Sequence, residues 1–567
     1  MVISARIEAI KRLLVFLILG CCATPTVFGG AKISTDLLLG DPDAVVDVIV
    51  QFQTPVTEAH HRKVIDRGGH LKQALDIVQG GLYSMRAGKL GDLAQDPDVY
   101  YISPDRTVRG MLDYAEPTIN ANIAFQYGFD GTGIGIAVID SGISNHPDLK
   151  NATGALRVLY SQDFVGGGTD DHYGHGEHVA GILAGNAASS TGPNFTHTFR
   201  GIAPNANLIN LRVLDQNGNG TDSNVIAAIG VAIKLQKTYR IRVINLSLGR
   251  PVFESYAQDP LCQAVEKAWN AGIVVVAAAG NDGRDNSQGT SGYVTITAPG
   301  NDPYVITVGS MKDMRTIARG DDLIASYSSK GPTLIDHIAK PDIVAPGNRI
   351  ISLLASTAQL TSLYPNNVVP LSYYSTTGSS ALSNYYFTLS GTSMAAPMVS
   401  GAAALLLQQN SKLTPDQVKA RLMKTATKSF PSTSIATDPV TGVTYTSQSD
   451  VFTIGAGYLD VWAALNNTDL ATTSALSPTS NYNSATGQVY LSFASTSVWG
   501  SNVVWGSNVV WGSNVFLNAS NVVWGSNVVW GSSTTTGFNV VWGSKAVWGS
   551  TSQDSLESST IALNGEN

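Results

Sequence analysis

Cysteine is scarce in this chain of 567 residues: there are three, and two of them, Cys21 and Cys22, lie near the N-terminus. If the N-terminal segment is removed, only Cys262 remains, so we expect a mature chain without an internal disulfide. Cys262 lies in the helix-like run 261–271 and is expected to be a small buried hydrophobic residue. The chain is too long for one hydrophobic core, so we expect several domains that depend on packing, with bound ions as a further source of stability.

Charged residues are also few. They make up 14% of the chain against 43% hydrophobic residues, which excludes a mostly disordered polyelectrolyte. Lys and Arg number 35 and Asp and Glu 42, which gives a formal net charge of −7. Because no basic cluster stands out, the sequence predicts no nucleic-acid partner.

The apolar stretch near the N-terminus, residues 13–19, is too short to span a bilayer comfortably. Basic residues precede it and small residues follow it, which is the pattern of a signal peptide. We therefore predict a signal peptide over residues 1–29 and a secreted protein. Two alternatives stay open. The sequence around Cys21 loosely resembles a bacterial lipobox, and a lipid on Cys21 would attach the protein to the cell surface. An uncleaved N-terminal segment would instead act as a membrane anchor.

Two folded regions are expected after this segment. Residues 44–109 have the pattern of a small mixed α/β unit. From 131 to about 465, helix-like runs alternate with apolar strand-like runs of little internal alternation, as expected when helices cover both faces of a sheet. The sequence therefore predicts an α/β fold with a doubly wound, mostly parallel sheet, whose functional residues gather at the carboxyl ends of the strands. The expected strands are 134–139, 208–214, 243–246, 273–278 and 304–308, and the expected helices are 178–187, 223–235, 261–269, 392–408 and 415–425.

Two segments of biased composition follow. Residues 469–497, rich in Ser, Thr and Asn, have the composition of a linker. Residues 498–550 repeat the motif Val-Trp-Gly-Ser-Asn, with tryptophans such as Trp499 and Trp505 six residues apart. An even period places them on one side of a strand, whereas Gly-Ser-Asn predicts turns. Three interpretations of this tail stay open: stacked β units or a surface anchor, a platform that stacks on glycans, and a disordered tail.

Four polar residues stand where catalysis by serine would need them. Asp140 closes a strand-like run, Asn281 follows another, and His175 and Ser393 lie at the starts of helix-like runs. Acyl transfer by serine requires a hydroxyl, an imidazole that takes its proton, a carboxylate that orients the imidazole, and donors for the developing oxyanion. Each residue alone has an ordinary structural explanation, such as a turn or a helix start. Together they supply every part of that chemistry.

The segments around these residues carry a specific resemblance. VIDSGI, HGEHVAG, AAAGN and GTSMAAP are similar to the four signature segments of the subtilases, the subtilisin-like serine proteases, and the order Asp, His, Ser matches the family. The similarity extends over residues 115–468. It implies a subtilisin-like fold and a serine endopeptidase that hydrolyses polypeptide substrates through an acyl-enzyme, with no cofactor required for the chemistry.

The resemblance assigns a role to each matching catalytic residue. Ser393 would be the nucleophile, and His175 would be the general base and then the general acid. Asp140 would orient His175. Asn281 would form the oxyanion hole together with the backbone N–H of Ser393.

The resemblance also implies the residues that bind substrate. Ser247, Leu248 and Gly249 would form an extended edge that pairs with the substrate backbone as an added strand. Ala278 and Gly280 would help to line the pocket for the residue before the cleaved bond.

The chain departs from the family pattern near the catalytic histidine. Glu177 stands where the family commonly has threonine, and its carboxylate is expected to alter the pKa of His175. His178 is expected to be structural, because an H-x-x-H pair lacks the glutamate arrangement of zinc hydrolases. Loops 186–200 and 353–389 are longer than in compact subtilisins, so the residue preferred before the cut stays open.

Calcium is a further implication of the resemblance. His146-Pro147-Asp148-Leu149 is similar to a family segment whose aspartate binds calcium, so Asp148 is a candidate ligand of a structural Ca²⁺. The other ligands are expected from residues 186–200, a loop of altered length in which they cannot be placed. The alternative is a solvated turn aspartate.

Residues 44–109 resemble the inhibitor-like propeptide of subtilases, which is implied to assist folding, block the cleft and be removed by the enzyme itself. We expect self-cleavage between Arg109 and Glu116, with Tyr114 as a candidate last residue. The competing hypothesis is a surface adhesin, in which the protease fold is inactive and the repeats of 498–550 are the working part.

Overall fold

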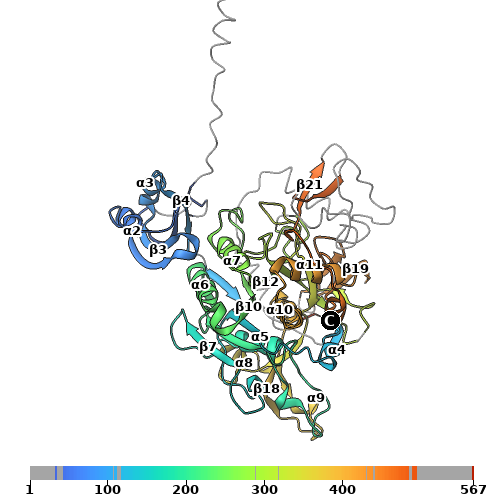
Figure 1. Ribbon diagram of the computed structural model, residues 1–567. Coiled ribbons are helices and arrows are strands. Elements are labelled where there is room, and N and C mark those ends of the chain that lie inside the picture. The colour runs from blue at the N-terminus through green and yellow to red at the C-terminus, as the bar shows by residue number, and fades with distance from the viewer. Residues whose placement is uncertain are drawn as a thin grey trace, which may run out of the picture.

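The structure is a computed structural model that describes residues 32–34, 37, 42–105, 107–110, 117–287, 289–316, 318–429, 431–438, 441–483, 488–494 and 565–566 (Figure 1). The predicted signal peptide, the tryptophan repeats and residues 111–116, where self-cleavage is expected, lie outside the described residues. Within the described ranges, no helix is both long enough and apolar enough to cross a membrane.

An N-terminal unit folds around a four-stranded antiparallel sheet in the order β2-β3-β1-β4. Its elements are β1 (Val45–Phe52), α2 (Glu58–Ile65), β2 (His70–Leu75), β3 (Gly80–Arg86), α3 (Leu90–Ala94) and β4 (Val99–Pro104). Successive residues of a strand point to opposite faces. Val48 and Val50 therefore join a small core with Val64 of α2, whereas Ile49 belongs to the large core of the main body. The unit has its own core and also packs on the rest of the protein.

The main body is built on an eight-stranded sheet in the order β14-β13-β12-β10-β6-β8-β7, with β15 also paired to β13. Its strands are β6 (Gly135–Asp140), β7 (Val158–Asp163), β8 (Asn207–Arg212), β10 (Ile241–Leu246), β12 (Val274–Ala278), β13 (Ile306–Lys312), β14 (Leu323–Ile324) and β15 (Ile343–Pro346). All pairs are parallel except β13 with β14. The chain runs from β6 to β7 and β8 on one side and then returns to β10 on the other. Open α/β sheets bind ligands at such a reversal, outside the carboxyl ends of the strands.

Helices pack around this sheet. They are α4 (Ala121–Gln126), α5 (His175–Ala184), α6 (Asp222–Tyr239), α7 (Pro260–Asn270), α10 (Thr392–Gln409), α11 (Pro415–Thr425) and α12 (Val461–Asn466). Helix α5 packs against α10, α6 packs against α7, and α10 also contacts β10, β12 and β13. The predicted α/β class with its mostly parallel sheet is confirmed.

Two predicted boundaries differ from the structure for local reasons. The helix expected over 178–187 begins at His175, directly after Gly174, whose φ of 107° ends the preceding loop. The strand expected over 304–308 begins at Ile306. The N–H of Tyr304 donates to Asp302 Oδ1 at 2.8 Å within a turn, so it is not available for pairing with a neighbouring strand.

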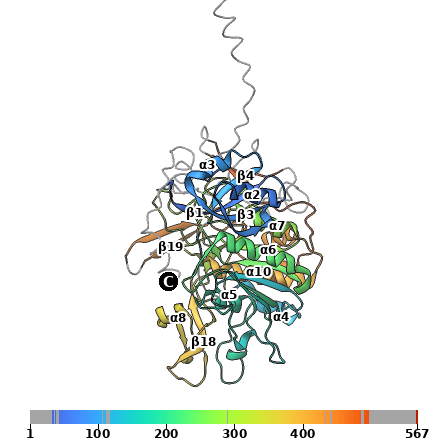
Figure 2. The same ribbon diagram turned by 90° about the vertical axis from the view of Figure 1, so that its left-hand side faces the viewer.

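The stretch before Ser393 forms an insertion with its own antiparallel sheet, in the order β16-β18-β17. Its elements are β16 (Ile350–Leu353), α8 (Gln359–Leu363), β17 (Val368–Pro370), α9 (Leu371–Tyr374) and β18 (Leu382–Leu389). Strand β16 packs against α5. Figure 2 shows the insertion (yellow) and the N-terminal unit (blue) at opposite ends of the main body.

Two hairpins lie near the C-terminal end of the main body: β19 (Thr433–Thr437) with β20 (Thr444–Gln448), and β21 (Thr479–Asn483) with β22 (Gln488–Ser492). Ser477 is buried, and its hydroxyl donates to Asp342 Oδ1 at 2.5 Å. The N–H of Ser480 donates to the carbonyl of His337 at 2.7 Å. The prediction of a linker over 469–497 is therefore wrong for its described part. That prediction is based on amino-acid composition, which does not show the tertiary hydrogen bonds of small polar residues.

Candidate active site

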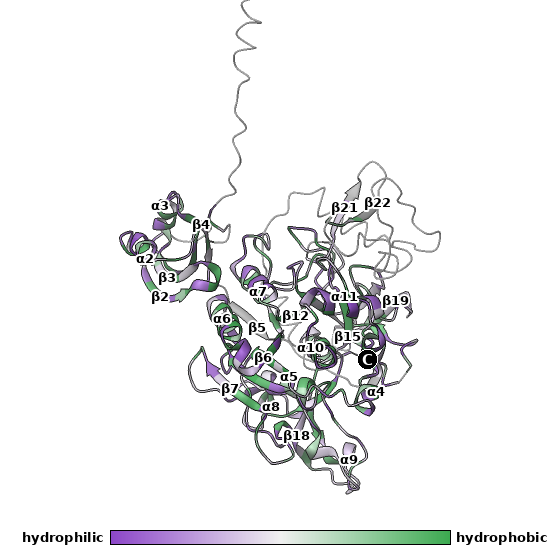
Figure 3. Cartoon of the chain, in the orientation of Figure 1, coloured by the Kyte–Doolittle hydropathy of each residue, from purple (hydrophilic) through white to green (hydrophobic). Residues whose placement is uncertain are grey.

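Helix α5 is buried along its whole length, although its first turn carries His175, Glu177 and His178. The residues from Val179 onward are mostly hydrophobic and belong to the large core (Figure 3). Burial of an ionisable side chain is costly unless it has a partner or becomes neutral. The polar first turn of this helix therefore depends on specific contacts.

His175 and Asp140 meet at the carboxyl end of β6, where the strand order reverses. Nδ1 of His175 lies 2.5 Å from Oδ1 of Asp140, and both side chains are buried. The backbone N–H of Ser141 donates to the same carboxylate oxygen at 2.7 Å. The carboxylate is thus positioned to fix the orientation of the imidazole.

The start of α5 is fastened to the end of β6 through the backbone. The N–H of Gly176 donates to Ser141 Oγ at 2.8 Å. A Cβ atom on Gly176 would lie 2.3 Å from the carbonyl oxygen of Gly142, so a side chain there would separate the two segments. This close approach explains why glycine follows His175 in the motif.

Ser393 is the second residue of α10 and is buried. Its hydroxyl donates to the carbonyl of Ser247 at 3.0 Å, and the hydroxyl of Ser247 donates to the carbonyl of Ser393 at 2.5 Å. The N-terminus of a helix favours negative charge at its first residues. The structure therefore joins Ser393 directly to the predicted substrate-binding edge.

Asn281 lies between the end of β12 and the start of α10. Its Oδ1 accepts hydrogen bonds from the backbone N–H of Thr392 at 2.8 Å and from the Thr392 hydroxyl at 3.1 Å. Its Nδ2 is buried and has no hydrogen-bond partner among the described residues. An unpaired buried donor costs about 1–3 kcal/mol and calls for an explanation. Thr392, which sequence reasoning missed, holds this amide in place.

The predicted pocket residues stand beside the same helix start. Ala278 ends β12 and is buried. Gly280 has a φ of 110°, and its N–H donates to Thr392 Oγ1 at 3.1 Å. A Cβ atom on Gly280 would lie 2.6 Å from Ser329 Oγ, so the space next to this residue is already filled on one side.

The predicted substrate edge is paired with a strand that follows the N-terminal unit. Strand β11 (Leu248–Gly249) pairs antiparallel with β5 (Thr107–Gly110), with Leu248 opposite Gly110 and Gly249 opposite Arg109. On its other side β5 pairs antiparallel with β9 (Asn219–Thr221). Strand β5 is therefore the middle strand of a three-stranded sheet built on the edge that begins next to Ser393.

Known proteins match both the sequence and the fold. The profile of Peptidase_S8, the subtilase family, matches residues 131–457, more than half of the chain. The chain belongs to the subtilase family. It is a subtilisin-like serine endopeptidase, and the matched range contains Asp140, His175, Asn281 and Ser393.

Individual relatives support the assignment. Serine protease AprX of Bacillus subtilis is 39% identical over 344 residues, covering 59% of this chain and 71% of the relative. Subtilisin E of Bacillus subtilis is 32% identical over 382 residues, covering 66% and 83%. The crystal structure of fervidolysin from Fervidobacterium pennivorans, a keratinolytic enzyme related to subtilisin, has a TM-score of 0.56 at 21% identity and supports the fold alone. The match covers 78% of this chain but less than two thirds, 64%, of fervidolysin.

Glu177, the departure from the subtilase pattern, is fully buried beside the catalytic histidine. Its Oε2 accepts from the N–H of Ser144 at 2.5 Å, and Oε1 has no partner among the described residues. Burial raises the pKa of Glu177 well above its ordinary value; the Ser144 N–H opposes this rise and the charge of Asp171 reinforces it. The predicted effect of Glu177 on the pKa of His175 stays a prediction.

His178 is a structural residue of this subtilase, as predicted. Its Nε2 lies 3.1 Å from the carbonyl oxygen of Phe387 and 3.3 Å from that of Ile350, both in the insertion sheet. Burial lowers the pKa of His178 to about 3, so the imidazole is neutral. The residue joins α5 to the insertion.

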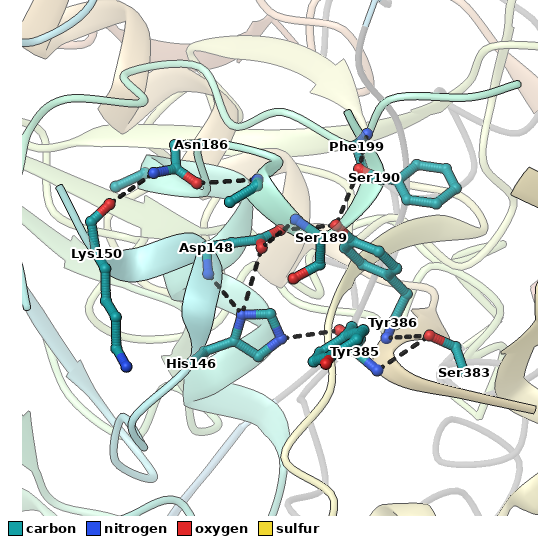
Figure 4. A network of polar contacts seen from close by, with 12 residues as sticks. His146, Asp148, Lys150, Asn186, Ser189, Ser190, Phe199, Ser383, Tyr385 and Tyr386 are labelled. Carbon is teal, nitrogen blue, oxygen red and sulfur yellow. Dashed lines mark hydrogen bonds and ion pairs between the residues drawn. The ribbon is translucent and has the colours of Figure 1, made fainter. Parts of the chain in front are cut away.

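Asp148, the candidate calcium ligand, is fully buried, so the alternative of a solvated turn aspartate is wrong. Its Oδ1 accepts from the N–H of Ser189 at 2.8 Å and its Oδ2 accepts from the Tyr386 hydroxyl at 2.7 Å (Figure 4). Hydrogen-bond donors thus face both oxygens, where Ca²⁺ would need further oxygen ligands. Across the described ranges, no group of three or more His, Cys, Asp and Glu side chains is placed to hold a metal ion. This donor set does not fit calcium.

Proposed function

We propose that the chain is a secreted endopeptidase in which Ser393 is the nucleophile, His175 the general base and acid, and Asp140 the residue that orients His175. The observation that carries this proposal is the buried contact between His175 Nδ1 and Asp140 Oδ1 at 2.5 Å. Because that contact engages Nδ1, Nε2 is the nitrogen that exchanges protons with Ser393 and the substrate.

The reaction forms and breaks one acyl-enzyme. The Ser393 oxygen bonds to the carbonyl carbon of the substrate while its proton passes to His175; the C–N bond then breaks and His175 returns the proton to the leaving amine. Water, activated by the same imidazole, hydrolyses the ester. The Ser393 hydroxyl must first turn from Ser247 toward His175, and such catalytic hydrogen bonds often form fully only when substrate is bound.

The oxyanion of the tetrahedral intermediate is bound by Asn281 Nδ2 and by the backbone N–H of Ser393. The partnerless buried amide of Asn281 supports this role, because an oxyanion would supply the acceptor that it lacks. Thr392 holds the opposite end of the amide, so the donor needs no reorganisation during the reaction.

The N-terminal unit acts as an inhibitor that the enzyme removes by self-cleavage. Strand β5 lies on the edge that substrate would use, which supports a blocked cleft. Arg109 pairs with Gly249 and Gly110 pairs with Leu248, so the chain occupies this edge directly before the segment in which we expect self-cleavage. We propose cleavage between Arg109 and Glu116, with Tyr114 as the candidate last residue of the removed part. Sequencing the mature N-terminus tests this: a start within residues 110–116 supports self-cleavage in this segment, and a mature, active enzyme that keeps the N-terminal unit refutes it.

Secretion depends on the N-terminal pattern. Residues 1–29 should direct the protein to the culture medium, and their deletion should retain it in the cell. Protein that stays with the cell surface, and is released when Cys21→Ser is introduced, would instead indicate a lipid on Cys21.

The decisive experiment compares casein hydrolysis and the mature N-terminus in wild type, Ser393→Ala and Ser400→Ala. Ser400 is a matched control, because it is buried in the same helix and its hydroxyl donates to Asn245 Oδ1 at 2.8 Å. Ser393→Ala should lower turnover about a millionfold and leave the N-terminal unit attached. Ser400→Ala should keep activity and processing. Equal activity of wild type and Ser393→Ala would remove Ser393 from the mechanism.

A further inference from the structure

The C-terminal end of the chain returns to the main body. Glu566 is buried, with 4% of its surface exposed. Its Oε2 accepts from the Arg284 guanidinium at 3.0 Å and from the Ser326 hydroxyl at 2.5 Å. Its Oε1 accepts from the Ser326 N–H at 2.6 Å and lies 3.6 Å from Lys312 Nζ. The carboxylate thus has two cations and two hydroxyl or amide donors in a site that water scarcely reaches.

The backbone of Glu566 is bound as well as its side chain. Asn348 Nδ2 donates to the carbonyl of Glu566 at 2.8 Å, and Asn348 Oδ1 accepts from its N–H at 3.0 Å. The preceding residue, Gly565, has a φ of 64° and lies against Ser390 and Arg349, where a Cβ atom would be 2.4 Å from Ser390 Oγ. The site therefore specifies a glycine followed by a glutamate.

Arg284, the cation closest to the Glu566 carboxylate, also has partners other than Glu566. Arg284 donates to Asp438 Oδ2 at 2.7 Å and to Ser326 Oγ at 2.7 Å, and its guanidinium lies 4.5 Å from the centre of the Tyr445 ring. Asp438 and Tyr445 lie outside the catalytic loops, at the β19–β20 hairpin. A guanidinium oriented in this way is suited to bind a carboxylate.

The partners of Glu566 come from segments that also carry the active site. Arg284 is three residues after Asn281, and Ser390, which Gly565 contacts, is three residues before Ser393. Asn348 lies in the loop that precedes β16, and the N–H of Gly391 donates to Gly347 at 3.0 Å. A carboxylate bound here connects the loop of the proposed oxyanion donor with the loop of the proposed nucleophile.

We propose that the main body contains an anion site for the chain's own Gly565–Glu566, and that this site anchors the dipeptide beside the loops of the proposed oxyanion donor and nucleophile. The β21–β22 hairpin is bonded to the main body as well, through Ser480 and His337. Two described segments that lie before and after the repeats in the sequence are therefore both bonded to the catalytic domain.

Hydrogen exchange of the Ser326 amide tests the anchor directly, because that N–H donates to Glu566 Oε1. The experiment uses the full chain with Ser393→Ala, so its outcome does not depend on proteolysis. Glu566→Gln should accelerate exchange at Ser326 at least about tenfold, because a buried ion pair loses one partner. Glu557→Gln, which removes the same charge elsewhere in the C-terminal segment, should leave it unchanged, as should the amide of Ile244 in central strand β10 in both variants.

A second pair of measurements keeps the test decisive if Glu566→Gln folds poorly. Asn348→Ala removes only the backbone contacts and should also accelerate exchange at Ser326. A chain that ends at Asn564 should regain slow exchange when a synthetic peptide of residues 558–567 is added at millimolar concentration, but not with the same peptide carrying Glu566→Gln. Unchanged Ser326 exchange in Glu566→Gln and in Asn348→Ala would overturn the proposal, and so would equal effects of the two peptides.

Discussion

The side-chain amide of Asn281 is fixed at its oxygen by Thr392 and has no partner at its nitrogen among the described residues. If Nδ2 binds the oxyanion, its contact with substrate strengthens as negative charge develops, so its loss should appear in kcat and not in KM. Asn281→Leu removes the amide at similar length. We expect kcat and kcat/KM to fall by the same factor.

The expected size of the effect is carried over from a related enzyme. Loss of one oxyanion donor from a water-excluded site costs about 2.7–4 kcal/mol of transition-state stabilisation, which is about a 100- to 1,000-fold fall in kcat. That magnitude was measured on the corresponding donor of a subtilisin and is carried over to this relative. Asn281→Leu also leaves the N–H of Thr392 without its acceptor, which should lower stability by about 1–3 kcal/mol.

Asn301→Leu is the matched control for this substitution. Asn301 is also fully buried, its Nδ2 also has no partner within the described part of the chain, and its Oδ1 accepts from the thiol of Cys262 at 3.3 Å. Its hydrogen bond with Cys262 involves none of the triad residues, so Asn301→Leu should keep kcat while changing stability. Steady-state kinetics on a chromogenic peptide, with urea unfolding of both variants, separates the two effects. A fall of less than about tenfold for Asn281→Leu, or equal falls for both variants, would refute the oxyanion assignment.

Three further predictions concern buried groups. Burial raises the pKa of Glu177, so the folded protein keeps a proton that the unfolded chain releases. The protonated carboxyl therefore contributes to the free energy of unfolding below the ordinary pKa of 4.5, and this contribution is lost as the pH rises through the folded pKa. Glu177→Gln cannot ionise, so its Tm relative to wild type should rise as the pH is increased above the ordinary pKa of 4.5. A difference that is constant with pH would contradict the buried carboxyl. Tyr386→Phe removes the O–H that Asp148 accepts and should cost about 1–3 kcal/mol in urea unfolding, with or without EDTA; a cost that changes in EDTA would mean that Asp148 binds a metal ion. Burial raises the pKa of the Cys262 thiol, so iodoacetamide should modify it only after unfolding, and rapid modification of the native protein would disprove its burial.

Local patterns predicted the elements of the fold with small errors at their ends. The apolar runs around 134–139 and 273–278 became β6 and β12 of the central sheet, because strands covered on both faces need hydrophobic residues at nearly every position. Helix α11 starts at Pro415 as predicted, and Thr414 forms a capping box with Gln417 before it. Boundaries failed where a side chain competes for a backbone N–H, as Asp302 does for Tyr304.

The linker prediction failed for a different reason. A stretch rich in Ser, Thr and Asn lacks the apolar residues that indicate a core, yet Ser477 is buried against Asp342 and Lys419, both themselves buried. Small polar side chains are fixed by such partners as firmly as hydrophobic ones are by packing. Composition records only the residue and not the partner.

The sequence by itself determined the chemistry of this protein, because its motifs contain the residue types that acyl transfer needs. Each motif is a continuous segment, and its own glycines and helix starts set its local backbone conformation. The tertiary structure decided what those segments contact. The pairing of β5 with β11, the hydrogen bond of Tyr386 to Asp148 across 238 residues, and the return of Glu566 to Arg284 join parts of the chain that no local pattern relates. Such contacts depend on the path of the whole chain, because a donor in one segment does not specify which distant acceptor the fold will bring to it.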